Sequence, residues 1–168
     1  MIQASIVGGS GFTGGELLRL LHTHPDVEVA QITSREYAGR YVYSVHPNMR
    51  GATQLQFIHP DALEACDVLF LAVPHGHSSN HIEHYASLAP KIIDLSADFR
   101  LGSVEAYKQW YGNDHANPDW LQKFVYGLPE FRREQLQGAN YASGVGCNAT
   151  TLNLALAPLV NSGMVDSI

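Results

Sequence analysis

Cys147 is the residue of this chain with the clearest capacity for covalent chemistry. Gly144 and Gly146 precede it and leave room in front of its sulfur, and the apolar residues up to Val160 predict a helix that begins beside it. Three polar side chains are placed to cap that helix: Asn148, Thr150 and Thr151. A thiol at the positive end of a helix dipole is stabilised as the thiolate, and free amides beside it can hold an oxyanion. We therefore expect Cys147 to be a nucleophile; the alternative is a small cysteine packed in the core.

Three glycines near the start of the chain form a second candidate site, one for phosphate. Gly8, Gly11 and Gly14 lie between an apolar segment, residues 2–7, and residues 14–24, whose leucines recur at helical spacing. Glycine lets the chain turn sharply there and lets a pyrophosphate approach the backbone amides and the positive end of the helix. This strand-turn-helix context favours dinucleotide binding over a plain structural turn.

The residues after the next expected strand indicate which dinucleotide is bound. Residues 27–33 form that strand, and Ser34 and Arg35 follow it. In a β-α-β unit a carboxylate at this position favours NAD, whereas a hydroxyl and a guanidinium suit the 2′-phosphate of NADP. We expect Ser34 and Arg35 to select NADP; the alternative for Arg35 is a solvent-exposed arginine without a ligand.

The remaining segments alternate between strand-like and helix-like patterns. We expect strands at residues 54–58, 67–73, 91–95 and 140–143, and helices at residues 77–88, at 103–111 and just after a turn at 126–130. The apolar run 67–73 is typical of a strand buried on both faces. This alternation predicts an α/β fold, namely a Rossmann-like, doubly wound, mostly parallel sheet with helices on both faces.

Two of these strands end in residues that could contact a ligand. Residues 74–76 (Pro-His-Gly) follow strand 67–73, and the polar cluster 96–100 follows strand 91–95. In open parallel sheets ligands bind at the carboxyl ends of the strands. We therefore expect both loops to line the site.

Composition excludes several classes of protein. The chain has 168 residues, of which 45% are hydrophobic and 15% charged, as in one ordinary globular domain. Its longest apolar runs are far shorter than the ~20 residues of a membrane-spanning helix. A net charge of −6 with three lysines gives no basic field for nucleic acid. No secretory signal precedes the first strand and only Cys66 and Cys147 occur, so we expect a cytoplasmic protein without a disulfide framework.

A histidine stripe offers a rival interpretation as a metal site. His77, His81 and His84 recur on one side of an expected helix, and His75 is close to them in sequence. No cysteine or carboxylate elsewhere in the sequence has the spacing of a metal site. We therefore expect a partly exposed helix face and no functional metal.

Six segments together resemble the N-acetyl-γ-glutamyl-phosphate reductases of the semialdehyde dehydrogenase superfamily. They are Gly8 to Gly14, Thr33 to Arg35, Ala38-Gly39, Asp94 to Arg100 (DLSADFR), Tyr126 to Glu130 (YGLPE) and Gly146-Cys147. Their order and spacing match along the whole chain, which makes the set far more specific than any one motif. The resemblance implies NADP-dependent reduction of an N-blocked ω-acyl phosphate to a semialdehyde, with release of phosphate, in arginine biosynthesis.

The resemblance also implies roles by position. Cys147 would attack the acyl phosphate and carry a thioester, and Ser96 and Arg100 would hold the substrate phosphate. The cofactor would be bound by Gly8, Ser10, Gly11, Phe12, Thr13, Gly14, Ser34, Arg35, Pro74, His75 and Gly76. At full length such an enzyme would be a homo-oligomer.

Two departures from the family pattern concern the substrate and the second domain. Arginine-pathway enzymes usually show Pro-Gly-Cys-Tyr around the nucleophile, whereas residues 145–148 here are Val-Gly-Cys-Asn, closer to the branch that reduces an aminoadipyl phosphate in lysine biosynthesis. Both substrates therefore stay open. Family members are considerably longer, and their catalytic histidine lies in a second, substrate-binding domain.

This comparison divides the chain into two parts. We expect residues 1–146 to form the NADP-binding domain and residues 147–168 to form the nucleophile-bearing helix, which leads toward a second domain outside this chain. On its own, the chain should bind NADP better than it turns over a substrate.

Two other classes compete with this interpretation. Short-chain dehydrogenases share the glycine spacing but need a Tyr-x-x-x-Lys pair, and the residues four before the three lysines are Ser87, Val104 and Asp119, which excludes that class. A non-catalytic NADP-sensing module would need the cofactor turn but no reactive thiol. That module stays open as the alternative.

Overall fold

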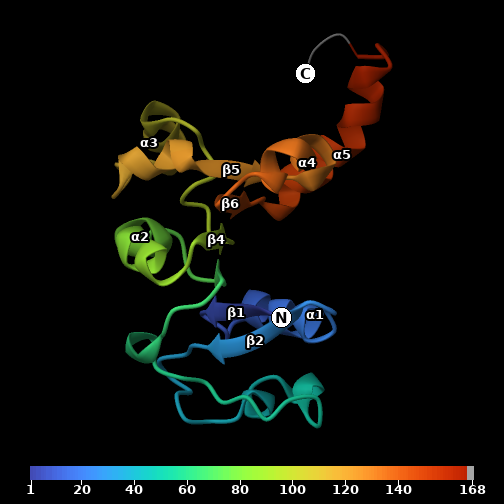
Figure 1. The fold of residues 1–168 in the computed structure, drawn as a ribbon. Coiled ribbons are helices and arrows are strands. Elements are labelled where there is room, and N and C mark those ends of the chain that lie inside the picture. Colours follow the sequence, from blue (N-terminus) through green and yellow to red (C-terminus); the bar gives the residue numbers. More distant parts are fainter. Residues whose placement is uncertain (166–168) are drawn as a thin grey trace.

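The computed structural model describes residues 1–165, and its centre is a six-stranded, entirely parallel sheet (Figure 1). The elements are β1 (Ile2–Val7), α1 (Phe12–His22), β2 (Val27–Ile32), β3 (Val68–Leu71), α2 (His77–Leu88), β4 (Lys91–Asp94), α3 (Val104–Tyr111), β5 (Phe124–Gly127), α4 (Pro129–Gln137), β6 (Tyr141–Gly144) and α5 (Cys147–Asn161). Short 3-10 helices lie in the connections at Val42–Ser44, Pro47–Met49, Pro60–Ala62 and Pro118–Lys123. The strand order β2-β1-β3-β4-β6-β5 confirms the expected Rossmann-like, doubly wound α/β fold.

Helices cover both faces of the sheet, and each face has its own apolar core. In Figure 1, α2 and α3 lie on one side, and α1, α4 and α5 on the other. Successive residues of β3 point to opposite faces: Leu69 and Leu71 join the core that includes Ile82 of α2, whereas Phe70 packs against the core that includes Leu18 of α1. The strand therefore contacts a core on each face, as its continuous apolar run indicates.

Two sequence expectations about strands are wrong. Residues 54–58 form no strand; Gln56 and Ile58 make only isolated bridges, while Phe57 between them is buried in the core beneath α1. A strand that the sequence missed, β5, lies at Phe124–Gly127, where the Gly-Leu-Pro signal indicated a turn. β5 is short and pairs only with β6, at the edge of the sheet, so little of it reads as a buried apolar run.

The glycine turn between β1 and α1 packs backbone against backbone. Gly8 has φ +79° and a side chain on it would meet the Ala72 carbonyl, and a Cβ on Gly14 would lie 2.6 Å from both Gly8 O and Gly9 Cα. Gly11 differs, because its φ is −77° and the nearest atom to an added Cβ, Gly8 O, is 3.7 Å away. Two of the three predicted glycines are therefore required by the fold, whereas the third leaves open space.

His46 holds the turn from the long connection 37–51. Its Nε2 lies 2.8 Å from the Gly9 carbonyl oxygen, and this nitrogen must donate because a carbonyl only accepts. A Cβ on Gly15 would run into the His46 ring. The connection, whose role could not be predicted from its sequence, thus supports the first helix.

A buried carboxylate organises the start of α2. The N-cap residue Gly76 has φ +85° and no side chain to bond the first turn. Asp98, which follows β4 and is fully buried, accepts instead from the backbone amides of Gly76 at 2.6 Å and Ser79 at 2.7 Å. The same carboxylate lies 2.8 Å from His75 Nδ1. One side chain from the neighbouring strand therefore caps the helix and fixes the loop before it.

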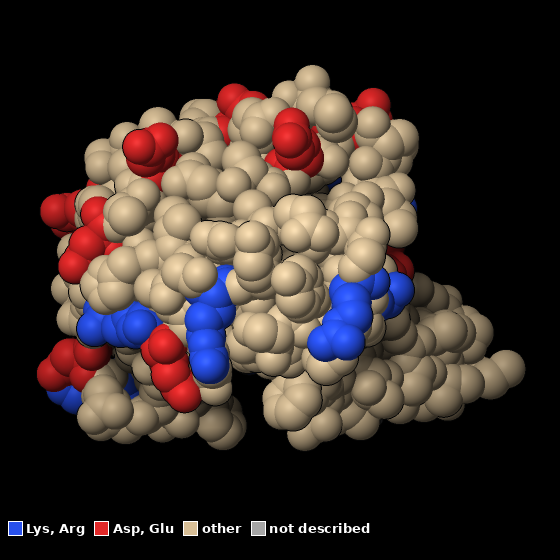
Figure 2. Space-filling view, turned by 90° about the horizontal axis from the view of Figure 1, so that it is seen from below, with Lys and Arg blue, Asp and Glu red and all other residues tan. Residues whose placement is uncertain are grey.

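The surface carries separated charges. On the face in Figure 2, Lys and Arg side chains stand apart, with uncharged surface and acidic side chains between them. That face therefore presents no continuous basic patch of the kind that nucleic acid requires. Within residues 1–165, no helix is long and apolar enough to cross a membrane.

The contrast between the glycines predicts different outcomes for two alanine substitutions. Gly14→Ala forces a methyl group into backbone that cannot move aside, so we expect a loss of about 3 kcal/mol in the free energy of unfolding. Gly11→Ala meets open space and should cost less than about 1 kcal/mol. Urea unfolding of both variants of the complete gene product checks this, and equal losses would contradict it.

Because Asp98 caps α2, its removal should lower the protection of nearby backbone amides from hydrogen exchange. Asp98→Ala leaves the amides of Gly76 and Ser79 without their acceptor, at a cost of about 3 kcal/mol, whereas Asp98→Asn keeps one acceptor oxygen and should cost less. Hydrogen exchange over residues 74–80 should accelerate strongly in the alanine variant. Unchanged exchange there would show that Asp98 does not hold this segment.

Candidate functional site

The expected site residues gather at one edge of the sheet, because every strand runs in the same direction. The glycine turn follows β1, Ser34 and Arg35 follow β2, residues 74–76 follow β3, Ser96 and Arg100 follow β4, and Cys147 follows β6. This edge is where ligands bind in open parallel sheets. Residues from distant parts of the sequence are thus placed together by topology alone.

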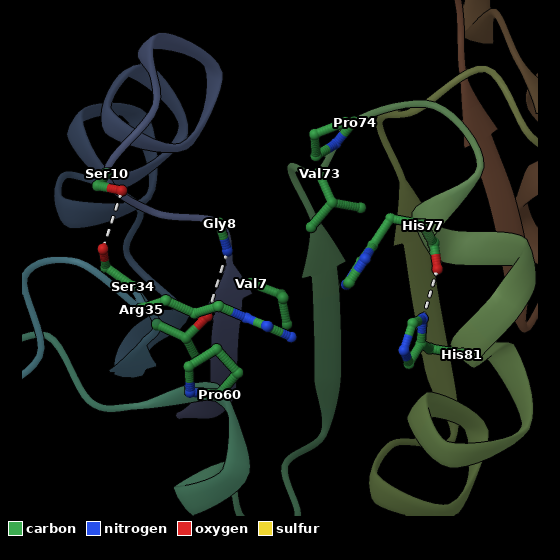
Figure 3. Close-up of a pocket in the computed structure, with 11 residues that line it drawn as sticks. Val7, Gly8, Ser10, Ser34, Arg35, Pro60, Val73, Pro74, His77 and His81 are labelled. Atoms are coloured by element: carbon green, nitrogen blue, oxygen red, sulfur yellow. Dashed lines mark hydrogen bonds between the residues drawn. The ribbon is translucent and has the colours of Figure 1, made fainter.

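A cavity of about 430 Å³ opens between the ends of β1, β2 and β3 (Figure 3). Its lining residues are Val7, Gly8, Ser10, Thr33, Ser34, Arg35, Pro60, Val73, Pro74, His77 and His81. Five of them, Gly8, Ser10, Ser34, Arg35 and Pro74, belong to the predicted cofactor set. Apolar side chains form one part of the wall, and hydroxyl, guanidinium and imidazole groups form the rest. No carboxylate lines it.

The hydroxyl groups of this cavity are connected. Ser34 Oγ donates to Ser10 Oγ at 3.0 Å and accepts from the Tyr37 amide at 3.2 Å, so its hydrogen-bonding capacity is largely occupied. Ser10 accepts from Ser34 and keeps its own proton for a ligand. Thr33 Oγ1 accepts from the Gly8 amide at 3.2 Å and thereby ties the end of β2 to the glycine turn.

The sequence indicates His77 and His81 only as candidate metal ligands, yet both line this cavity. Their rings stack with centroids 4.3 Å apart, and His81 Nδ1 donates to the His77 carbonyl at 2.9 Å. Partial burial lowers the pKa of His77, and the nearby His81 and Arg35 lower it further. In the part of the chain that the structure describes, no group of three or more His, Cys, Asp or Glu residues could hold a metal ion.

The loop 74–76 is held by a chain of polar contacts through His75. Nδ1 of His75 donates to Asp98, and Nε2 lies 3.2 Å from the Tyr107 hydroxyl. Burial, with the charge of Asp98 and the neighbouring Tyr111, raises the pKa of Tyr107 to about 12. Tyr107 therefore stays protonated and donates to Nε2, so both nitrogens of a neutral His75 are already bonded within the protein.

Ser96 is positioned by the second buried carboxylate of β4. Its hydroxyl donates to Asp94 Oδ2 at 2.7 Å and accepts from the Asp98 amide at 3.1 Å. Burial raises the pKa of Asp94, while hydrogen bonds from Ser78 and Ser96 act in the opposite direction. The only proton that Ser96 can donate is therefore engaged, and its expected contact with a substrate phosphate stays a prediction.

Cys147 is the first residue of α5, and its side chain is exposed. Arg100 lies beside it: the guanidinium donates through Nε to Gly144 O at 2.8 Å and through Nη2 to Leu95 O at 3.2 Å. A Cβ added to Gly146 would lie 3.2 Å from Arg100 Nη1, so glycine is what allows the guanidinium to come this close to the thiol-bearing turn. An exposed cysteine and the first amides of a helix thus directly follow a glycine that lies close to a fixed cation.

The expected caps of this helix are wrong. The N-cap residue is Gly146, which has no side chain to offer, and the hydroxyls of Thr150 and Thr151 instead bond to the carbonyls of Gly146 and Cys147 four residues before them. Ser and Thr often make this backward bond inside helices. The first amides of α5 consequently receive no side-chain cap and are available to a ligand.

A second cavity, of about 590 Å³, lies between the start of α1 and the residues that precede the nucleophile. Its lining includes Thr13 at the start of α1, Arg100, and Gly144 and Val145 just before the nucleophile. The predicted residue Phe12 lines neither cavity, because its side chain is fully exposed. Thr13 thus shares a cavity with residues that come just before the cysteine, while Phe12 has no described partner that supports a binding role.

Several important residues were missed from the sequence. The sequence indicates Asp98 only as part of the polar cluster 96–100 and Asp94 only as part of a family motif, and His46 lies in a connection without a readable pattern. Their roles depend on contacts over 16 to 37 residues of sequence. A pattern within one element carries no signal of that kind.

Comparisons with known proteins identify the family of this chain. The family described as semialdehyde dehydrogenase, NAD binding domain, matches residues 3–139. The LysW-L-2-aminoadipate/LysW-L-glutamate phosphate reductase of Saccharolobus solfataricus is 49% identical over 168 residues, which cover 98% of this chain and 48% of that protein. The N-acetyl-gamma-glutamyl-phosphate reductase of Acinetobacter baumannii (strain AYE) is 48% identical over 164 residues, covering 96% of this chain and 47% of that protein. The chain therefore spans about half the length of the curated relatives it matches.

Among solved structures, aspartate semialdehyde dehydrogenase II of Vibrio cholerae superposes with a TM-score of 0.65 at 12% identity, covering 96% of this chain and 47% of that one. At 12% identity, the similarity to this structure supports the fold alone. The family match covers most of the chain and includes the glycine turn and the strands up to β5. The chain therefore belongs to the semialdehyde dehydrogenase family and contains its NAD-binding domain.

Proposed function

We propose that this chain is the cofactor-binding and nucleophile-bearing part of an NADP-dependent reductase that converts an N-blocked ω-acyl phosphate to its semialdehyde. The observation that carries the proposal is the position of Cys147. It is exposed and begins a helix without a side-chain cap, and Gly146, directly before it, lies close to the Arg100 guanidinium at the carboxyl edge of the sheet. A nucleophile, an anion-binding cation and an oxyanion site are the groups that acyl transfer from a phosphate requires.

The chemistry follows from these groups. The Cys147 thiolate attacks the acyl carbon, the bond from that carbon to the phosphate oxygen breaks, and inorganic phosphate leaves with the electron pair. Arg100 stabilises the charge on the departing phosphate, and the first amides of α5 hold the oxygen of the tetrahedral intermediate. Bound NADPH would supply the hydride that reduces the resulting thioester to aldehyde. The cysteine then leaves as thiolate, which restores the starting state.

The cofactor site fits a dinucleotide. Gly11 is not required by packing, since an added Cβ would make only an ordinary contact with Gly8 O at 3.7 Å, and it lies at the start of α1, where a pyrophosphate needs close approach to amides. The cavity in Figure 3 adds an apolar wall suited to a base and the side chains of Ser10 and Arg35. A guanidinium in a cavity without a carboxylate favours a 2′-phosphate, which supports NADP over NAD.

The choice of substrate is proposed from the names of two similar proteins. One is named for LysW-L-2-aminoadipate and LysW-L-glutamate phosphates and another for N-acetyl-gamma-glutamyl phosphate. We propose an acyl phosphate of one of these two lengths, in lysine or arginine biosynthesis. Asn148 directly follows the nucleophile and is exposed, so it is placed to contact the part of the substrate that differs between them.

The general acid or base is proposed to lie in a second domain. The relatives are about twice as long as the matched region. The predicted second segment, residues 147–168, is described up to residue 165; its last three residues lie outside the described part. No residue of α5 is buried, and its surface exposes four large apolar side chains: Leu152, Leu154, Leu159 and Val160. This supports the proposal that the second domain or another subunit of a homo-oligomeric enzyme packs against α5.

Substitution of the nucleophile tests the proposal. In the complete gene product, Cys147→Ser should lower the rate of NADPH oxidation with N-acetyl-γ-glutamyl phosphate or the aminoadipyl analogue by at least about a thousandfold, because a serine hydroxyl is a far weaker nucleophile than a thiolate. The matched control is Cys66→Ser, which should retain activity. Cys66 is half-buried and burial raises its pKa, so its thiol is unsuited to catalysis.

Two results would contradict the proposal. Full turnover by Cys147→Ser would remove the thioester step. No turnover by the unaltered protein with either substrate, together with tight NADP binding, would favour the non-catalytic NADP-sensing module. In that case Cys147 should also fail to react faster than Cys66 with an alkylating reagent at neutral pH.

A further inference from the structure

The stacked pair His77 and His81 forms a wall of the cavity that faces Arg35. In Figure 3 the side chains of Arg35 and His77 extend toward each other across the pocket, one from the segment after β2 and the other from α2. Neither histidine belongs to the predicted cofactor residues. Three groups that can carry positive charge therefore line one cavity in a chain whose net charge is −6.

The hydrogen bonds of the two rings leave each with a nitrogen for a ligand. His81 Nδ1 donates to the His77 carbonyl at 2.9 Å, so Nε2 is its other nitrogen. His77 Nε2 lies 3.2 Å from the Tyr85 hydroxyl, which leaves Nδ1. Among the described residues, no hydrogen bond is formed by His81 Nε2 or His77 Nδ1. A protonated ring would turn each of these nitrogens into a charged donor.

The surroundings of His77 lower its pKa and so disfavour the protonated ring in the absence of an anion. Arg35 faces it from the segment after β2, His81 and the Tyr85 hydroxyl from its own helix, and Asp98 from the loop after β4. Partial burial and the two cationic neighbours lower its pKa, and the more distant effect of Asp98 only partly opposes them. A phosphate in the cavity would add two negative charges beside these groups and raise the pKa of His77.

We infer that His77 and His81 complete, with Arg35, the subsite for the 2′-phosphate of NADP, and that His77 takes up a proton when this phosphate binds. The inference rests on the proposed use of NADP and deepens it. NAD lacks the 2′-phosphate and therefore offers no such anion to a protonated His77. The preference for NADP over NAD therefore increases as pH falls.

The direction and size of the expected change in NADP affinity with pH follow from proton linkage. A group whose pKa is low in the free protein and higher in the complex binds a proton on complex formation, so affinity rises as pH falls through that interval. For each proton taken up, the dissociation constant changes by up to about tenfold per pH unit. Between pH 7 and 8.5 the 2′-phosphate itself is mostly dianionic, since its second pKa is about 6, so the change in this interval reports on the protein.

The experiment measures binding of NADP and of NAD to the complete gene product by calorimetry at pH 7 and 8.5. It is repeated in buffers of different ionisation enthalpy to count the protons taken up. The variants are His77→Gln, His81→Gln and the double substitution, because glutamine keeps a polar side chain but cannot titrate. His84→Gln is the matched control, since His84 lies exposed on the same helix but does not line the cavity.

We expect NADP to bind at least about threefold more tightly at pH 7 than at 8.5, with net proton uptake, while NAD binding changes little. The double variant should lose the pH dependence and bind NADP about tenfold more weakly at pH 7. His84→Gln should behave like the unaltered protein, and the circular dichroism of all variants should match.

Three outcomes overturn the inference. NADP binding that is independent of pH overturns the inference about His77 and His81 but leaves NADP as the proposed cofactor. A pH dependence that persists in the double variant has the same consequence. An equal pH dependence for NAD assigns the protons to groups away from the 2′-phosphate. Failure of NADP to bind at either pH overturns the proposed cofactor and this inference together.

Discussion

The burial of two carboxylates at the end of β4 is the constraint on which the site depends. Asp94 and Asp98 are fully buried, and a carboxylate removed from water is costly unless donors surround it. The donors come from Ser78, Ser96, His75 and the first amides of α2. Satisfying these two charges therefore fixes the loop after β3, the start of α2 and, with them, one wall of the cavity in Figure 3.

The other side of the cofactor site is set by contact between backbones. Gly8 and Gly14 allow the turn to close on itself, and His46 ties the turn to the connection outside the sheet. Gly11 has no close neighbour that packing requires, since an added Cβ would lie 3.7 Å from Gly8 O. Packing thus constrains Gly8 and Gly14, and we propose that pyrophosphate binding constrains Gly11.

The sequence predicted the elements with strong periodicity and the site residues that belong to a motif. The glycine turn, Arg35 and Cys147 all lie at the ligand-binding edge because each follows a strand that its own residues specify. The edge strand β5 and the histidine wall of the cavity were not predicted, since the first is short and the second depends on how α2 is oriented. Asp98 shows the same limit: its three bonds join segments about 20 residues apart, which no local pattern contains.

The central claim is that Cys147 carries the acyl group of the substrate. The most direct test is to mix the complete gene product with N-acetyl-γ-glutamyl phosphate or its aminoadipyl analogue in the absence of NADPH. The intact mass of the protein is then measured. Without a hydride donor the reaction should stop at the thioester. The account predicts a single added acyl group per chain, located by peptide mapping at Cys147, with release of one phosphate. An enzyme that reduces either substrate but accumulates no adduct, or carries it at another residue, would contradict the account.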